Sequence, residues 1–186
     1  MAKKLKEREL VQRCLKNDRK AQKELYERYG PLMKMVCIRY LYQKALAEEV
    51  MNRGFYKVFR NLKDYRHTGS FEGWIRRIFV NTSIENYRKE QRRGNSVEVE
   101  DVEGELKIDS TSFQKFGYDE LMKIVQQLPL GYKTVFNMYV IEGYSHKEIA
   151  EQLGVTESTS KTQLHKARLL LQKSVLELDE YSSGRK

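Results

Sequence analysis

Proline is nearly absent from this sequence, with two residues in 186, and there are only eleven glycines. Because these two residue types most disfavour helix interiors, their scarcity beside many Leu, Lys, Glu, Arg and Gln residues favours helix throughout. Alternation of apolar and polar residues with β-branched side chains, which is typical of strands, is also scarce. The length suits two small domains, each with a modest core. The sequence therefore predicts an all-α protein.

Cysteines and long apolar runs are equally sparse. Cys14 and Cys37 both lie in helical apolar patterns, and no Cys or His pair has the spacing of metal ligands. We therefore expect reduced thiols in a core, no metal and no other cofactor. No stretch of about 18 apolar residues occurs, and the charged amino end has no apolar run behind it, which argues against a secretion signal or transit peptide. These absences predict a soluble, cytoplasmic protein with no segment inserted in a membrane.

The net charge of +9 is unevenly distributed. Residues 1–93 hold 24 basic and 11 acidic side chains, whereas residues 94–120 hold 2 basic and 8 acidic ones. A strongly basic segment favours a polyanionic partner such as nucleic acid. Residues 94–112 have no helical period and carry six carboxylates, which is typical of a flexible acidic linker. We predict a helical bundle at 1–93, a linker at 94–117 and a helix-turn-helix domain of four helices at 118–186.

Apolar periodicity predicts the helices of each domain. A break at Asn17-Asp18 is expected in the first stretch, about 5–29, and Gly30-Pro31 is expected to end this stretch and begin a helix that runs to about 42. Further helices are expected at about 45–61 and, after Ser70 as N-cap, at about 71–91. Beyond the linker we expect helices at about 118–127, 130–141, 146–153 and 157–178.

The last two of these helices carry the most specific pattern. Ser145 and Glu148 form a capping box, Gly154 suits a sharp turn, and Thr156 can cap the next helix. On that next helix an inward row is expected at Ser160, Leu164, Ala167 and Leu171, which leaves polar, short and basic side chains pointing outward. Such a helix suits the major groove of DNA. The alternative is a helical hairpin packed on another protein.

These residues resemble a known family. Residues 128–172 are similar to the fourth region of extracytoplasmic-function RNA polymerase sigma factors, although Ser160 stands where that family usually has a branched apolar residue and Gln163 where it often has Arg. The resemblance implies contacts with the minus-thirty-five promoter element. The residues expected to make them are Ser145, His146, Thr156, Ser158, Thr159, Lys161, Thr162, His165, Lys166 and Arg168.

The first 93 residues resemble the second region of the same family, from Leu10 through the Phe71, Trp74, Ile75, Ile78 and Asn81 pattern. The resemblance implies that helix 45–61 docks on core RNA polymerase, through Glu48, Glu49, Asn52, Arg53, Phe55 and Tyr56. Glu49, Asn52 and Arg53 depart from the usual pattern. For Phe55 and Phe59 the alternative to contact with polymerase is a place in the core.

The resemblance also implies capture of melted bases of the minus-ten element near the 62–69 loop, where aromatic residues alternate with cations that can neutralise phosphates. The expected DNA contacts there are Tyr65, Arg66, His67, Arg76, Arg77, Asn81, Arg88 and Lys89. Trp74 is expected in the core, because apolar residues share its helical neighbourhood.

The sequence therefore predicts an alternative sigma factor, without catalysis, whose partners are core RNA polymerase, promoter DNA and an anti-sigma factor. The acidic linker is either a passive spacer or, by resemblance, a segment that enters the nucleic-acid channels of the polymerase. One alternative is a stand-alone helix-turn-helix regulator, which should bind DNA tightly without polymerase and as a symmetric dimer. A nuclease is disfavoured, since the acidic residues are scattered or lie in the linker.

Overall fold

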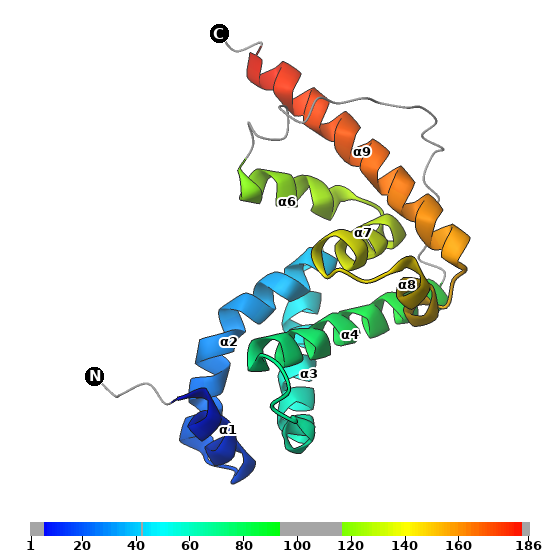
Figure 1. The fold of residues 1–186 in the computed structure, drawn as a ribbon. Helices are drawn as coiled ribbons and strands as arrows, with labels where there is room; N and C mark the ends of the chain where they lie inside the picture. Colours follow the sequence, from blue (N-terminus) through cyan, green and yellow to red (C-terminus); the bar gives the residue numbers. More distant parts are fainter. Residues whose placement is uncertain (1–5, 42, 94–116, 184–186) are drawn as a thin grey trace. The chain divides into compact units, whose positions relative to one another are not determined.

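The computed structural model describes residues 6–41, 43–93 and 117–183, and all regular structure in these ranges is helical. The chain divides into two compact units, residues 1–86 and 87–186. Figure 1 follows the described helices in chain order. The all-α prediction is confirmed. The predicted linker lies, apart from Gly117, outside the described residues, so the domain limits stay a prediction.

Unit 1 begins with a sharp corner between α1 (Glu7–Leu15) and α2 (Arg19–Tyr40). Asn17 has a φ of 59°, in the left-handed region that Asn tolerates better than most residues. Asp18 caps α2 by accepting hydrogen bonds from the backbone N–H groups of Lys20 and Ala21, at 2.9 and 3.2 Å. The guanidinium of Arg13 donates to the same carboxylate at 2.7 and 2.9 Å, and this contact holds the pKa of Asp18 below its usual range. The predicted break at this point is confirmed.

The expected helix boundary at Gly30-Pro31 is wrong, because α2 continues through Pro31 to Tyr40. Proline removes one backbone donor and usually clashes with the Cβ of the residue before it. Gly30 has no Cβ, which removes the side-chain part of this clash. The interior residues of α2, Leu25, Met33, Val36 and Cys37, are 0% exposed, and their burial stabilises an uninterrupted helix.

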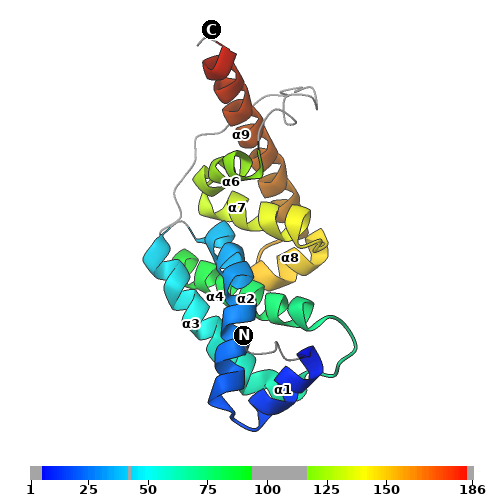
Figure 2. The same ribbon diagram turned by 90° about the vertical axis from the view of Figure 1, so that its left-hand side faces the viewer.

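Unit 1 also contains α3 (Lys44–Asn61), the short 3-10 helix η1 (Leu62–Asp64) and α4 (Phe71–Arg92) as far as Asn86, after which the helix belongs to unit 2. Helices α2 and α3 lie side by side in Figures 1 and 2. Helix α3 approaches α4 closely at Gly54, where Phe79 packs and also meets Phe55 with ring centroids 5.1 Å apart. Ser70 accepts a hydrogen bond from Gly73 N–H at 3.0 Å, as expected of an N-cap. The predicted burial of both thiols is confirmed, since Cys14 and Cys37 are buried and unpaired.

Unit 2 contains α6 (Tyr118–Gln127), α7 (Leu130–Phe136), the π-helical turn η2 (Asn137–Ile141), α8 (His146–Leu153) and α9 (Glu157–Ser183). Helix α9 is the longest helix of the unit and contacts α6, α7 and α8 (Figure 1). The core between α6 and α9 consists of Ile124, Val125, Leu128, Ala167, Leu171 and Val175. The wide turn η2 continues α7, and the Asn137 side chain donates to the carbonyl of Lys133 at 2.9 Å inside it. This turn directs the chain back toward α8.

Candidate nucleic-acid interface

Helices α8 and α9 form the helix-turn-helix that the sequence predicts. Ser145 Oγ accepts from the N–H of Glu148 at 3.2 Å, and the Glu148 carboxylate accepts from the N–H of Ser145 at 2.8 Å. Gly154 ends α8 with a φ of 71°, a conformation that costs glycine little. Thr156 Oγ1 accepts from the N–H of Thr159 at 3.0 Å and so caps α9. Both helix starts and the turn are therefore determined by local hydrogen bonds and backbone preference.

The inward row of α9 is confirmed. Ser160, Leu164, Ala167 and Leu171 are between 0 and 8% exposed. The opposite side of the helix carries the exposed residues Ser158, Lys161, Thr162, His165 and Arg168, and Thr159 and Lys166 are half-buried. Ser145 and Thr156, which act as caps, are also exposed. The outward surface thus combines hydroxyl groups with cations near a helix N-terminus, where the helix dipole also favours negative groups.

Lys161 forms an ion pair with Glu157, one turn earlier on α9, at 2.9 Å. This contact lowers the pKa of Glu157, and Lys161 itself remains 61% exposed. Water and salt screen an exposed pair of this kind, so it contributes little to stability. A phosphate can therefore displace the carboxylate at small cost.

His146 is half-buried and contacts two other elements of unit 2. Its Nδ1 lies 2.9 Å from Ser160 Oγ, and its ring stacks on Tyr139 with centroids 4.4 Å apart and planes at 23°. Burial lowers the pKa of His146, and the nearby cations Lys161 and Arg168 lower it further, against the opposing effect of Glu157. The sequence did not predict this cluster, and the one available signal was a hydroxyl in an otherwise apolar row.

A second candidate surface lies in unit 1, at the loop between η1 and α4. A pocket of about 420 Å³ lies where this loop meets the start of α4. It is lined by Asp64, Tyr65, Arg66, Thr68, Gly69, Ser70, Gly73, Trp74 and Arg77. Tyr65 donates a hydrogen bond to the carbonyl of Gly69 at 2.7 Å and so closes the loop on itself. His67 has a φ of 57° and its ring lies 4.5 Å from that of Tyr65.

Trp74 differs from the expectation of a core residue. It is half-buried, stacks on Phe71 with centroids 5.7 Å apart and planes at 13°, and lines the pocket. Trp74 lies in the first turn of α4, which borders the 62–69 loop rather than another helix. Its side chain is therefore only half-buried. The structure thus gives the pocket an aromatic wall beside the cations Arg66 and Arg77.

The other residues expected to contact the minus-ten element lie along α4. Arg77, Asn81, Arg88 and Lys89 are exposed, and Arg76 is half-buried. Arg77, Asn81 and Arg88 are spaced by four and seven residues, so they share one side of the helix.

Helix α3 presents the residues expected to contact polymerase, with one correction. Glu48, Glu49, Asn52 and Tyr56 are exposed, and Tyr56 is 65% exposed. Phe55 is only 4% exposed and packs against Tyr26 and Phe79, so its side chain belongs to the core and the alternative role applies. The cause is its place on the inner side of α3, next to Gly54.

The half-buried Arg53 side chain forms ion pairs within the protein. Its guanidinium lies 3.8 Å from the Glu49 carboxylate and 3.3 Å from that of Glu85 on α4, and Lys57 donates to Glu85 at 2.6 Å. The three charged side chains of α3 and Glu85 therefore form one network. It links α3 to α4 at the edge of the surface expected to dock.

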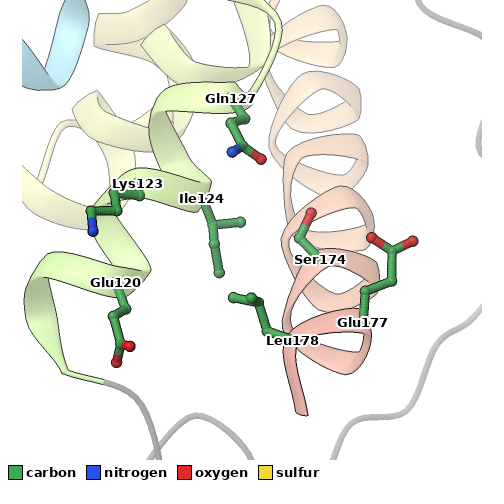
Figure 3. A pocket seen from close by; sticks show the side chains of 7 residues that line it. All are labelled: Glu120, Lys123, Ile124, Gln127, Ser174, Glu177 and Leu178. Atoms are coloured by element: carbon green, nitrogen blue, oxygen red, sulfur yellow. The ribbon is translucent and has the colours of Figure 1, made fainter. Parts of the chain in front are cut away.

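Unit 2 also contains an open cleft between α6 and the last part of α9. It measures about 490 Å³ and is lined by Glu120, Lys123, Ile124, Gln127, Ser174, Glu177 and Leu178. Ile124 and Leu178 point toward one another across it, with charged side chains at its margin (Figure 3). The cleft is remote in sequence from the turn between α8 and α9.

A helix-turn-helix with a polar outer helix, together with a second helical unit bearing an aromatic and basic pocket, defines the class of DNA-binding transcription proteins. Comparison with known proteins narrows this class. The family model for sigma-70 region 2 matches residues 25–93, and that for sigma-70 region 4 matches residues 118–171.

Relatives match along nearly the whole chain. The chain is 28% identical to the ECF RNA polymerase sigma-E factor of Haemophilus influenzae, covering 94% of this chain and 98% of the relative. It is 29% identical to the ECF RNA polymerase sigma-E factor of Escherichia coli K12, covering 90% and 93%. A solved structure of the sigma factor RpoE in complex with the anti-sigma factor NepR from Bartonella quintana matches at 19% identity and a TM-score of 0.49, covering 84% of this chain and 97% of that one.

The chain belongs to the extracytoplasmic-function sigma factors, with sigma-70 regions 2 and 4. It is an alternative RNA polymerase sigma factor. Because this family is not enzymatic, the expectation that the chain is not an enzyme is confirmed.

Two absences apply only to the residues that the structure describes. No helix among them combines the length and apolar character needed to cross a membrane. Within the same ranges, no group of three or more His, Cys, Asp or Glu side chains is placed to hold a metal ion.

Proposed function

We propose that unit 2 recognises the minus-thirty-five promoter element by inserting α9 in the major groove. The observation that carries this proposal is the exposure of Ser158, Lys161, Thr162, His165 and Arg168 on one side of a capped helix whose other side is buried. Hydroxyl and cationic side chains at a helix N-terminus can contact both base edges and phosphates.

Unit 1 contributes the minus-ten contacts. An unstacked base needs a stacking surface and a cation near its phosphate, and the pocket beside Tyr65 offers both through Trp74 and Arg77. The hydrogen bond from Tyr65 to Gly69 and the ring contacts of Tyr65 hold the loop in place before DNA arrives. The ordering cost on binding is lower as a result. Capture of a base in this pocket promotes DNA melting.

The docking surface for core polymerase is the exposed side of α3, with Glu48, Asn52 and Tyr56 as its central contacts. Arg53 takes part through its ion pairs with Glu49 and Glu85, which fix the side chains at the edge of that surface. Because polymerase and promoter DNA lie in the cytoplasm, the protein acts there. An anti-sigma factor, the kind of partner with which the sigma factor RpoE of Bartonella quintana was solved, is the proposed regulatory partner.

Run-off transcription with core polymerase tests the whole proposal. Genomic fragments transcribed with and without the protein should yield new, selective start sites only when the protein is present. Equal or reduced transcription would contradict the proposal. Tight operator binding by a symmetric dimer without polymerase would favour the stand-alone regulator instead.

A matched pair of lysines tests the role of α9. Lys161 and Lys173 are both exposed on this helix, twelve residues or about 18 Å apart. Lys161→Ala should weaken promoter binding by the holoenzyme and lower the slope of log affinity against log salt by about 1, as expected for one lost phosphate contact. Lys173 would lie beyond the groove, so Lys173→Ala should leave both the affinity and the salt slope unchanged. An equal effect of the two substitutions would contradict the docking of the α9 N-terminus.

A further inference from the structure

Three elements of unit 2 meet at the His146 ring. Tyr139 of η2 covers one face of the ring, and Ser160 of α9 lies 2.9 Å from Nδ1. Ser160 is 0% exposed, and His146 is the first residue of α8. The contact therefore joins the start of α8 to the first turns of α9, directly behind the side of α9 that faces outward.

The polar character of this contact has a structural consequence. The other members of the inward row, Leu164, Ala167 and Leu171, are apolar and tolerate small rotations of the helix. A hydrogen bond depends on direction and distance, and a buried hydroxyl left without a partner costs free energy. The pair consequently fixes the rotation of the first turns of α9 about the helix axis, where apolar packing alone would leave it looser.

The outward residues of those turns depend on this rotation. Ser158, Lys161 and Thr162 lie within two residues of Ser160 along the helix, and successive residues are separated by a rotation of about 100°. A rotation of α9 moves these side chains sideways in the groove without changing which of them are exposed. Reading of individual bases is more sensitive to such a shift than attraction to phosphates is.

We propose that His146 and Ser160 are positioning residues for promoter reading: their hydrogen bond, supported by the Tyr139 ring, sets the orientation of α9 in the groove. This inference rests on the proposed role of α9 and replaces the expectation that His146 contacts DNA directly. It assigns the pair an effect on discrimination between sequences rather than on general affinity for DNA.

The test uses holoenzyme formed from the full chain and core polymerase, bound to a promoter fragment found by the run-off experiment. Dissociation constants are measured for this fragment and for fragments with each minus-thirty-five base pair substituted. Ser160→Ala removes the hydroxyl, and His146→Phe removes Nδ1 but keeps a ring to stack on Tyr139. His146→Asn restores a polar atom near the position of Nδ1. Circular dichroism of each variant fixes a temperature at which all are folded.

Loss of the hydrogen bond should reduce discrimination by about threefold to tenfold, the range of one net hydrogen bond. Ser160→Ala and His146→Phe should have the same effect, and the double variant should lose no more than either single one, because all three lack the same bond. His146→Asn should retain most of the discrimination. The salt slope should be unchanged in every variant, because the phosphate contacts remain.

The contrary results are distinct. If His146→Phe weakens binding to all fragments equally while Ser160→Ala has no effect, His146 contacts DNA directly and the inference is wrong. If both variants keep full discrimination while Lys161→Ala weakens binding, the inference fails and the proposed function stands. If wild-type holoenzyme shows no promoter preference, the proposed function fails and the inference fails with it.

Discussion

Replacing Gly54 with alanine should destabilise unit 1, although alanine is the better helix former. Gly54 lies in the interior of α3, where the exchange by itself would stabilise the helix by about 1 kcal/mol. A Cβ at this position, however, would lie closest to Cε1 of Phe79, and 2.7 Å from Cζ and 2.8 Å from Cδ1 of the same ring. Carbon atoms in normal contact are about 3.5–4.0 Å apart, so the ring would have to move by about 1 Å.

The Phe79 ring has little room for such a movement. It is 0% exposed and packs edge-on against Phe55, which in turn contacts Tyr26. Overpacking of this kind costs about 1–3 kcal/mol, and three close contacts place Gly54→Ala near the upper end. After subtraction of the helix-propensity gain, we expect the free energy of unfolding to fall by about 1–2 kcal/mol.

Trp74 makes the measurement specific to unit 1. It is the only tryptophan of the chain and stacks on Phe71 at the start of α4. Denaturant unfolding followed by Trp74 fluorescence therefore reports this unit. A loss of about 1–2 kcal/mol should lower the denaturant midpoint and leave the slope unchanged, as expected when only stability changes. Asn52→Ala is the matched control, because Asn52 is exposed on the same helix and only the propensity gain applies. A Gly54→Ala variant as stable as Asn52→Ala would refute the packing argument.

Two further outcomes follow from the site and its support. Burial and the hydrogen bond with Glu7 raise the pKa of Tyr29 to about 12, above its ordinary value of 10.0. The folded state thus holds this proton more tightly than the unfolded chain, so its contribution to stability is complete below pH 10 and is lost as the pH rises toward 12. Tyr29→Phe should flatten the alkaline decline of unit 1 stability measured through Trp74, and an unchanged decline would contradict the assignment. In unit 2, Gly154→Ala should cost about 1–2 kcal/mol because φ is 71°, and Gly154→Asn should cost less. Thermal unfolding followed by circular dichroism should reveal this order while the Trp74 transition stays unchanged, and equal stability of both variants with the wild type would count against a strained turn.

Elements with local signals were predicted well from the sequence. The capping box at Ser145 and Glu148, the left-handed turn at Gly154 and the cap at Thr156 depend on residues within four positions of one another, and all three are present. The inward row of α9 follows from helical periodicity alone, and it is buried as expected. The break at Asn17-Asp18 belongs to the same group.

Predictions that depended on distant neighbours were less accurate. Pro31 was expected to begin a helix, but the burial of α2 on both sides of it and the missing Cβ of Gly30 allow the helix to continue. Trp74 was expected in the core and instead lines a pocket, because the 62–69 loop rather than another helix lies beside it. At Pro31, tertiary packing outweighed the local preference of proline for a helix start. At Trp74, packing depended on a loop whose position the sequence did not reveal.

The sequence by itself determined the helical class, the capped helix starts at Ser70, Ser145 and Thr156, and the outward and inward sides of α9, because backbone preference, capping and periodicity act over a few residues. Only the tertiary structure decided which partners the buried polar and aromatic groups have. The contacts of His146 with Ser160 and Tyr139, of Arg53 with Glu85, and of Gly54 with Phe79 join residues between 7 and 32 positions apart. Such contacts form only when helices pack at a particular distance and rotation, which no local pattern specifies.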